Sequence, residues 1–152
     1  MTAPRWLNDD EMRAWLAYRR MRLLLSTEIN RDLAREAGLS EADYDVLSGL
    51  TASDDRLRLG ELADRMLWSR SRLSHHITRM QQRGLVRREE VDGDARGSII
   101  VLTPQGRRTL EEAAPGHVAS VRRHLIDRLT PEQIRVLGEI GDVALEPFGE
   151  TL

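Results

Sequence analysis

Apolar residues recur along much of the chain with the three-to-four-residue period of amphipathic helices. The first such stretch begins after Asn8, where Glu11 completes a capping-box pattern, and continues without Gly or Pro to Gly38. This pattern predicts a helix of about 28 residues. Its apolar face is longer than packing on a small domain requires, so we expect it to meet another protein surface.

Shorter periodic segments follow in the middle of the chain. A second helix is expected after Ser40, and polar and apolar residues alternate at 56–59 as in a short strand. Two compact helices are expected at 60–67 and 70–83, with Ser69 as the N-cap of the second one. Two short helices joined in this way are typical of a helix-turn-helix.

A β-hairpin is predicted directly after the second compact helix. Segments 85–91 and 98–102 have strand character, and turn-forming residues at 92–97 separate them. A hairpin attached to a helix-turn-helix is called a wing.

Two helices are predicted after the wing. Thr103 can cap a long helix that ends near Arg128, and Thr130 begins a final helix that stops before Pro147. The predicted fold class is therefore mainly α with a small β wing (α+β).

Charge is distributed unevenly along the chain. Residues 56–108 carry a net charge of +6 and the remainder −8, which gives the total of −2. Between residues 65 and 88 there are seven Arg and two His but no acidic residue. A solvated surface of mixed charge does not exclude one sign over such a length, so this block predicts binding to a polyanion.

Composition excludes several other classes. The chain has no cysteine, which removes disulfides, thiolate zinc sites and thiol chemistry. No signal peptide or membrane-length apolar run is visible, so the prediction is a cytoplasmic protein without a membrane partner. No nucleophile–base spacing, phosphate loop or metal-ligand motif is found. We therefore expect no enzyme activity, no cofactor and no metal site.

The order of predicted elements resembles the MarR (multiple antibiotic resistance regulator) family of winged helix-turn-helix transcription regulators. Each matching fragment is short, but their order and spacing are characteristic. The fragments are Leu62-Ala63-Asp64-Arg65, Ser69-Arg70-Ser71, Gly84-Leu85-Val86-Arg87-Arg88, Asp94-Ala95-Arg96 and Leu102-Thr103-Pro104-Gln105-Gly106-Arg107.

The resemblance implies a single MarR-like domain over residues 1–152. Segments 8–38 and 104–148 would be dimerisation helices, and 40–103 the winged DNA-binding lobe. It further implies a homodimer that binds a pseudo-palindromic site on double-stranded DNA. A repressor is favoured, because such a dimer covers promoter DNA. A small aromatic or anionic effector would release it from a cleft beside the dimerisation helices.

The predicted recognition helix has an exposed face suited to DNA. Its N-terminal residues are expected at base edges in the major groove, where an Arg fork matches the acceptors of guanine. Ser69 is foremost a helix cap with a secondary phosphate contact. His76 faces the apolar side and is expected to be a packed core histidine. The predicted DNA-contacting residues of this helix and the following strand are Ser69, Arg70, Ser71, Arg72, Ser74, His75, Arg79 and Arg88, with Arg83 and Arg87 as further candidates for phosphate.

The predicted wing tip carries one arginine. Arg96 lies between turn residues, and we expect it to enter the minor groove, where A·T tracts deepen the negative potential. Asp94 is expected to orient an arginine at the base of the wing. A solvated loop charge is the alternative for Arg96.

Aromatic residues are few, and four of them lie on or beside segments that would border an effector cleft: Trp15, Tyr18, Tyr44 and Trp68. Core packing is the alternative for each. Two alternative functions also stay open, a helical protein-interaction module and a non-specific DNA-binding module without ligand response. Retention on random duplex DNA and its salt dependence separate the first alternative from a DNA-binding regulator.

Overall fold

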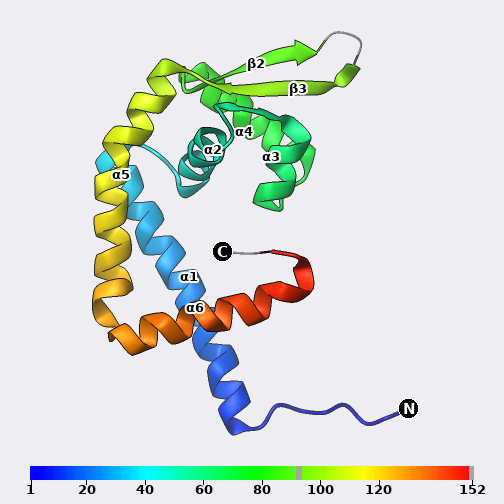
Figure 1. Ribbon diagram of the computed structural model, residues 1–152, viewed down its shortest axis with the longest axis vertical. Coiled ribbons are helices and arrows are strands. Elements are labelled where there is room, and N and C mark those ends of the chain that lie inside the picture. The colour runs from blue at the N-terminus through cyan, green and yellow to red at the C-terminus, as the bar shows by residue number, and fades with distance from the viewer. Residues whose placement is uncertain (92–93, 151–152) are drawn as a thin grey trace. The chain divides into compact units, whose positions relative to one another are not determined.

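The computed structural model describes residues 1–91 and 94–150, and their side chains except those at 94–96 (Figure 1). Helices dominate and a small sheet accompanies them, so the predicted fold class is confirmed. The elements are α1 (Asp9–Ala37), α2 (Glu41–Thr51), β1 (Arg56–Arg58), α3 (Leu59–Met66), α4 (Arg70–Gln82), β2 (Val86–Val91), β3 (Asp94–Leu102), α5 (Pro104–His124) and α6 (Pro131–Leu145), with short 3-10 turns at Ile126–Arg128 and Glu146–Phe148.

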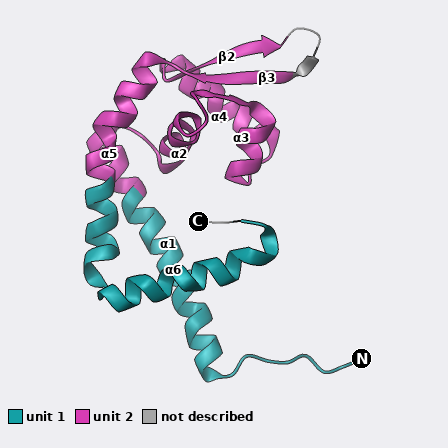
Figure 2. Cartoon of the chain, viewed as in Figure 1, with its two compact units in different colours: residues 1–29, 118–152 teal, residues 30–117 magenta. Residues whose placement is uncertain are grey.

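The chain forms two compact units (Figure 2). Unit 1 comprises residues 1–29 and 118–152, and unit 2 comprises residues 30–117. Long helices α1 and α5 each pass from one unit to the other. Unit 2 contains the helix-turn-helix and the sheet, whereas unit 1 contains α6 and the outer parts of α1 and α5.

The sheet of unit 2 has three antiparallel strands in the order β1-β3-β2. The register pairs Leu57 with Ile100 and Val86 with Leu102, which directs these apolar side chains to the helices. Strands β2 and β3 extend together as a hairpin beyond the helices of this unit (Figure 1). This hairpin is the predicted wing.

Unit 2 has a continuous apolar core beneath the sheet. Its members come from every helix of the unit and from the strands, and each fully buried large side chain contributes roughly 1.5–3 kcal/mol. The most buried are Leu39, Val46, Leu47, Leu50, Leu62, Leu73, Ile77, Met80, Val86 and Ile100. This core fixes the relative positions of α2, α3 and α4.

Local sequence signals set most helix boundaries. At the start of α1, the side chains of Asn8 and Glu11 each accept a hydrogen bond from the backbone N–H of the other residue. Thr130 and Gln133 form the same pair of bonds at the start of α6. After α4, Gly84 has a φ of +76°, and a Cβ there would lie 2.7 Å from Oε1 of Gln105. A glycine is therefore required for the turn into β2.

Two sequence expectations were wrong. The segment predicted as the loop 92–97 is shorter, because β3 already begins at Asp94, which pairs with Val91. The helix predicted to end near Arg128 ends at His124, since Leu125 leaves helical geometry with φ −132°. The 3-10 turn that follows is bridged by an ion pair of 2.6 Å between Arg122 and Asp127.

Candidate nucleic-acid interface

The helix-turn-helix consists of α3, α4 and the turn between them. Leu67 ends α3 in a left-handed conformation with φ 55°, and the Trp68 backbone N–H donates to the carbonyl of Ala63. Ser69 Oγ then accepts a hydrogen bond of 3.1 Å from the backbone N–H of Arg72, as its predicted capping role requires. The first turn of α4 has no acidic side chain, so the helix dipole and the cationic side chains both favour an anion here.

Burial separates two faces of α4. The inner face consists of Leu73, His76, Ile77 and Met80, which are all buried. Five predicted DNA-contacting residues of this helix are exposed and one, Ser74, is half-buried; the exposed ones are Arg70, Ser71, Arg72, His75 and Arg79. The structure therefore brings the predicted recognition residues to one accessible surface of the helix.

Arg72 is held flat against an aromatic ring. Its guanidinium carbon lies 3.7 Å from the ring centroid of Trp68, which is a close cation–π contact. On another side, Trp68 meets the ring of His76 edge-on, with centroids 5.4 Å apart. Trp68 was predicted to border an effector cleft, and that role stays a prediction; the structure adds a contact with an arginine of the recognition helix.

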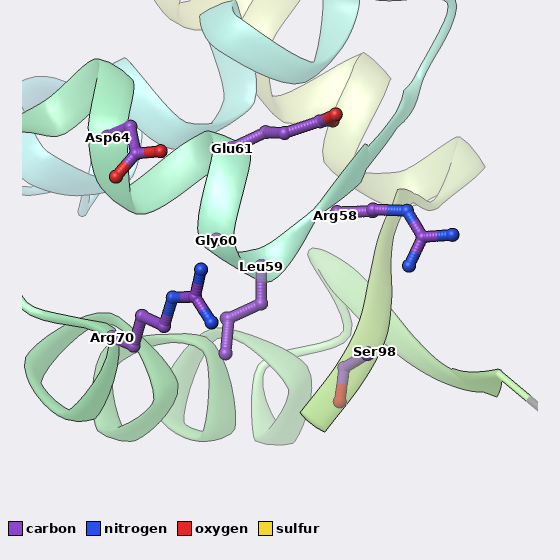
Figure 3. Close-up of a pocket in the computed structure, with 8 residues that line it drawn as sticks. Arg58, Leu59, Gly60, Glu61, Asp64, Arg70 and Ser98 are labelled. Atoms are coloured by element: carbon purple, nitrogen blue, oxygen red, sulfur yellow. The ribbon is translucent and has the colours of Figure 1, made fainter. Parts of the chain in front are cut away.

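Arg70 lies at a cleft of about 400 Å³ between the start of α3, the start of α4 and strand β3. Its guanidinium is directed toward Gly60 and Leu59 (Figure 3), and a Cβ at position 60 would lie 2.9 Å from Nη2 of Arg70. Arg58 also lines this cleft, as do the carboxylate residues Glu61 and Asp64. Charges on its walls are thus mixed rather than uniformly basic.

A buried carboxylate links α2 to the recognition helix. Asp43 is 4% exposed and accepts hydrogen bonds from the backbone N–H of Ser40 at 2.9 Å and from Nη1 of Arg83 at 2.8 Å. Nε2 of His76 lies 2.9 Å from its other oxygen, at hydrogen-bond distance but without the alignment of a good hydrogen bond. Burial alone raises the pKa of Asp43, but the contacts from His76, Ser40 and Arg83 outweigh it and lower that pKa well below the usual carboxyl range.

His76 is therefore the packed core histidine that the sequence predicts, with 8% exposure. Its Nδ1 lies 3.3 Å from Nη2 of Arg79. The contact between His76 and Asp43 was not predicted, because Asp43 lies three residues after the helix cap Ser40 and that spacing indicates only a local capping role.

Several arginines of the basic block contact other groups of unit 2. Nη2 of Arg83 donates to the carbonyl of Gly38 at 2.6 Å, in addition to its bond to Asp43. Nη2 of Arg88 donates to the carbonyl of Ser74 at 3.0 Å, which ties the wing to α4. These two side chains stabilise the lobe itself.

At the base of the wing, Glu89 forms ion pairs with two arginines. Its carboxylate accepts hydrogen bonds from Arg87 at 2.6 Å and from Arg56 at 2.7 Å. These two bonds lower the pKa of Glu89 below its ordinary value. The side chains of the predicted wing residues Asp94 and Arg96 lie outside the described part of the structure, so their roles stay predictions.

The aromatic residues predicted to border an effector cleft are divided between the two units. Trp15 and Tyr18 belong to unit 1, where their rings stack with centroids 6.1 Å apart. Tyr44 belongs to unit 2 and packs on His117, with ring centroids 4.1 Å apart. Trp68, in the same unit, contacts a different histidine.

A small cavity lies beside the Tyr44–His117 pair. It has a volume of about 110 Å³ and is lined by Glu36 from α1 and by Glu112 and His117 from α5. Nδ1 of His117 is buried and has no hydrogen-bond partner among the described residues. The sequence analysis missed His117 here, because only the fold brings α5 against Tyr44.

The described residues contain neither a cluster of metal ligands nor a membrane-spanning helix. No group of three or more His, Asp or Glu side chains there is arranged to hold a metal ion. Nor does this part of the chain contain a helix that is long and apolar enough to cross a membrane.

The capped, acid-free recognition helix and the attached hairpin define a winged helix-turn-helix protein. Comparison with known proteins agrees: residues 37–97 match the model of the MarR family. A solved structure of AbsC, a MarR family transcriptional regulator from Streptomyces coelicolor, is 44% identical, with 96% of each chain covered and a TM-score of 0.83.

Sco3205, another MarR family regulator of S. coelicolor that was solved in complex with DNA, is 41% identical over 98% of this chain and 94% of its own, with a TM-score of 0.89. The repressor YetL from Bacillus subtilis is 30% identical over 107 residues, which are 68% of this chain and 64% of YetL. The chain belongs to the MarR family of transcriptional regulators, as its sequence motifs predicted.

Proposed function

We propose that this regulator is a sequence-specific repressor that binds a pseudo-palindromic duplex operator as a homodimer. The observation that carries the proposal is the start of α4, where Arg70 and Arg72 stand exposed beside a capped helix N-terminus without an acidic residue. Backbone N–H groups at such a terminus suit phosphate, and Arg forks suit guanine. The solved DNA complex of Sco3205, a 41% identical protein, supports the same partner.

In this proposal α4 occupies the major groove and the wing the adjacent minor groove. Arg70 and Arg72 read base edges, and Arg96 enters the minor groove. Asp94 orients an arginine at the base of the wing. The other proposed contacts, to bases or phosphates, come from Ser69, Ser71, Ser74, His75, Arg79 and Arg88. For Arg88 the bond to Ser74 makes its contribution to the orientation of the wing as important as any phosphate contact.

The proposed dimerisation helices are 8–38 and 104–148, and the distribution of apolar side chains supports them. All buried apolar side chains of the described chain lie in unit 2, whereas those of unit 1 stay at least partly accessible. A second copy of the chain fits this surface, because such helices cannot otherwise remove their apolar faces from water. Large apolar residues of unit 1 with about half or more of their surface exposed are Met1, Trp6, Leu7, Trp15, Leu16, Tyr18, Leu23, Leu24, Val118, Ile140, Val143 and Phe148.

Repression is supported by YetL, which is named a repressor. A small aromatic or anionic effector is proposed to release the DNA, and chromosomal DNA as the partner makes the cytoplasm the proposed site of action. Trp15, Tyr18, Tyr44 and Trp68 stay proposed effector contacts. The cavity beside Tyr44 and His117 supports a ligand site near Tyr44.

The test is selection of bound sequences from a duplex pool with a randomised core at near-physiological salt. We expect enrichment of an inverted repeat and a steep fall of affinity with added salt. Binding without an enriched motif would indicate a non-specific DNA-binding module. Absence of binding even at low salt would indicate a protein-interaction module and contradict the proposal.

A further inference from the structure

We propose that Trp68 is a positioning residue for Arg72: by holding the guanidinium flat, it determines where α4 presents this side chain to DNA. Base preference would then depend on a tryptophan that contacts no base. The inference rests on the proposed function, in which Arg72 reads a base edge.

The short distance from Cζ of Arg72 to the Trp68 ring indicates that the guanidinium contacts the ring with its face, because an N–H directed at the ring would hold Cζ farther away. With Cζ of Arg72 3.7 Å from the ring centroid of Trp68, the two groups are in van der Waals contact. The N–H donors of a guanidinium lie in its plane and point outward, so stacking leaves the hydrogen-bonding fork available. An ion pair has the opposite effect. Nε and Nη2 of Arg87 both donate to Glu89, so these N–H groups are not available to a base.

The tryptophan is itself held in place by the fold. Its backbone N–H donates to the carbonyl of Ala63 at 3.0 Å, and its ring meets His76 edge-on. His76 is buried in α4 and contacts Asp43 of α2 at 2.9 Å. The ring under Arg72 is therefore fixed to the core of the lobe, although Arg72 itself is exposed.

A fixed aromatic ring changes how an arginine binds. A free Arg side chain has many rotamers and loses that freedom when it contacts a base. A stacked guanidinium has already lost part of it, and its fork points in a restricted set of directions. Both effects favour one base pair over its competitors, and neither requires the tryptophan to touch DNA.

The experiment compares Trp68→Leu, Trp68→Phe, Arg72→Ala and the double variant Trp68→Leu/Arg72→Ala. The probes are the duplex selected by the parent protein, the same duplex with single base-pair changes, and a random duplex. Leu67→Ala is the matched control, because Leu67 lies in the same turn and is 87% exposed. Thermal unfolding of each variant reports whether the lobe is folded.

We expect Trp68→Leu to reduce discrimination at the base pairs that Arg72→Ala affects, by about threefold to tenfold. The double variant should then lose no more than Arg72→Ala alone, which is the sign of coupled residues. Trp68→Phe retains an aromatic face and should restore most of the preference. Leu67→Ala should leave it unchanged.

Two results overturn the inference and are distinguishable. If Arg72→Ala alters the preferred base pairs and Trp68→Leu does not, the tryptophan only packs the turn, and the proposed function stands. If Arg72→Ala leaves base preference unchanged, the proposed role of Arg72 fails and the inference with it. If Trp68→Leu does not fold, Trp68→Met takes its place, with apolar bulk but no aromatic face, and is judged by the same criteria.

Discussion

Asp43 offers the sharpest test of how the recognition helix is held, through the substitution Asp43→Asn. One buried carboxylate accepts from Ser40 at 2.9 Å and Arg83 at 2.8 Å, and contacts His76 at 2.9 Å. Asparagine has nearly the same shape but carries no charge, and it offers one acceptor oxygen in place of two. Ser40 and Arg83 both donate to Oδ2, so an amide oxygen in that position accepts from them without the negative charge, and an NH₂ group replaces the oxygen beside Nε2 of His76.

The magnitude follows from these contacts. A hydrogen bond to a charged group contributes about 1.5–3 kcal/mol, and a weakened helix cap costs about 1 kcal/mol. The Arg83 side chain is 44% exposed, so water replaces part of its loss. We expect a net loss of roughly 2–3 kcal/mol, which for a chain of this size lowers Tm by about 5–10 °C.

The assay is urea and thermal unfolding at pH 7, followed by circular dichroism. Asp64→Asn is the matched control, because it removes the same charge from an exposed position of the same unit. We expect that control to stay within about 0.5 kcal/mol of the parent. If Asp43→Asn also stays within that range, the contacts of the carboxylate with His76 and Arg83 do not stabilise the packing of α2 against α4.

The pH dependence of stability gives the same prediction a second readout. Folding lowers the pKa of Asp43, so its ionised form stabilises the folded chain above the ordinary carboxyl pKa. That contribution is lost as the pH falls toward the folded-state pKa. The difference in stability between the parent and Asp43→Asn should therefore be full at pH 6–7 and begin to shrink only as the pH falls below about 4. If the difference in stability between the two proteins grew on acidification, the pKa of Asp43 would not be lowered by folding.

Two further predictions concern the dimer and the wing. Leu24→Glu should weaken self-association by on the order of a hundredfold, measured by sedimentation, because it places a carboxylate on the apolar face of α1. Arg22→Glu, two residues away on the opposite side of the helix, is the control and should leave a dimer. Arg96→Ala should weaken binding to the selected operator more than binding to random duplex. Equal losses on both duplexes would reduce Arg96 to a general phosphate contact.

Features that depend on residues close together in the sequence were predictable. Capping patterns at Asn8, Ser40, Ser69 and Thr130 give the helix starts, because each side chain bonds a backbone group three residues away. The burial of His76 also followed from helical periodicity, since it lies on the face that Leu73 and Met80 occupy in α4.

Features that depend on tertiary contacts were not predictable in this way. Asp43 and Arg83 are forty residues apart, and only the packing of α2 against α4 makes one the acceptor of the other. The stack of Arg72 on Trp68 has a local spacing of four residues and was open to prediction. It was missed because Trp68 precedes the helix cap and was assigned to a ligand cleft.

The basic block at residues 65–88 contains more arginines than are available to contact DNA. Of its arginines, Arg83, Arg87 and Arg88 donate to carboxylate or carbonyl oxygens within the lobe. The bond of Arg83 joins the end of α4 to α2, and the bond of Arg88 joins the wing to α4. The guanidinium edges of Arg70 and Arg72 are bound to no carboxylate within the described residues, and both stand where the helix dipole is positive. The sequence shows that positive residues follow one another along this segment. Only the fold shows which of them form bonds within the lobe and which remain available to a ligand. If the proposed base contacts of Arg70 and Arg72 are right, carboxylates such as Asp43 contribute to specificity only indirectly, by holding α4 in one position within the lobe.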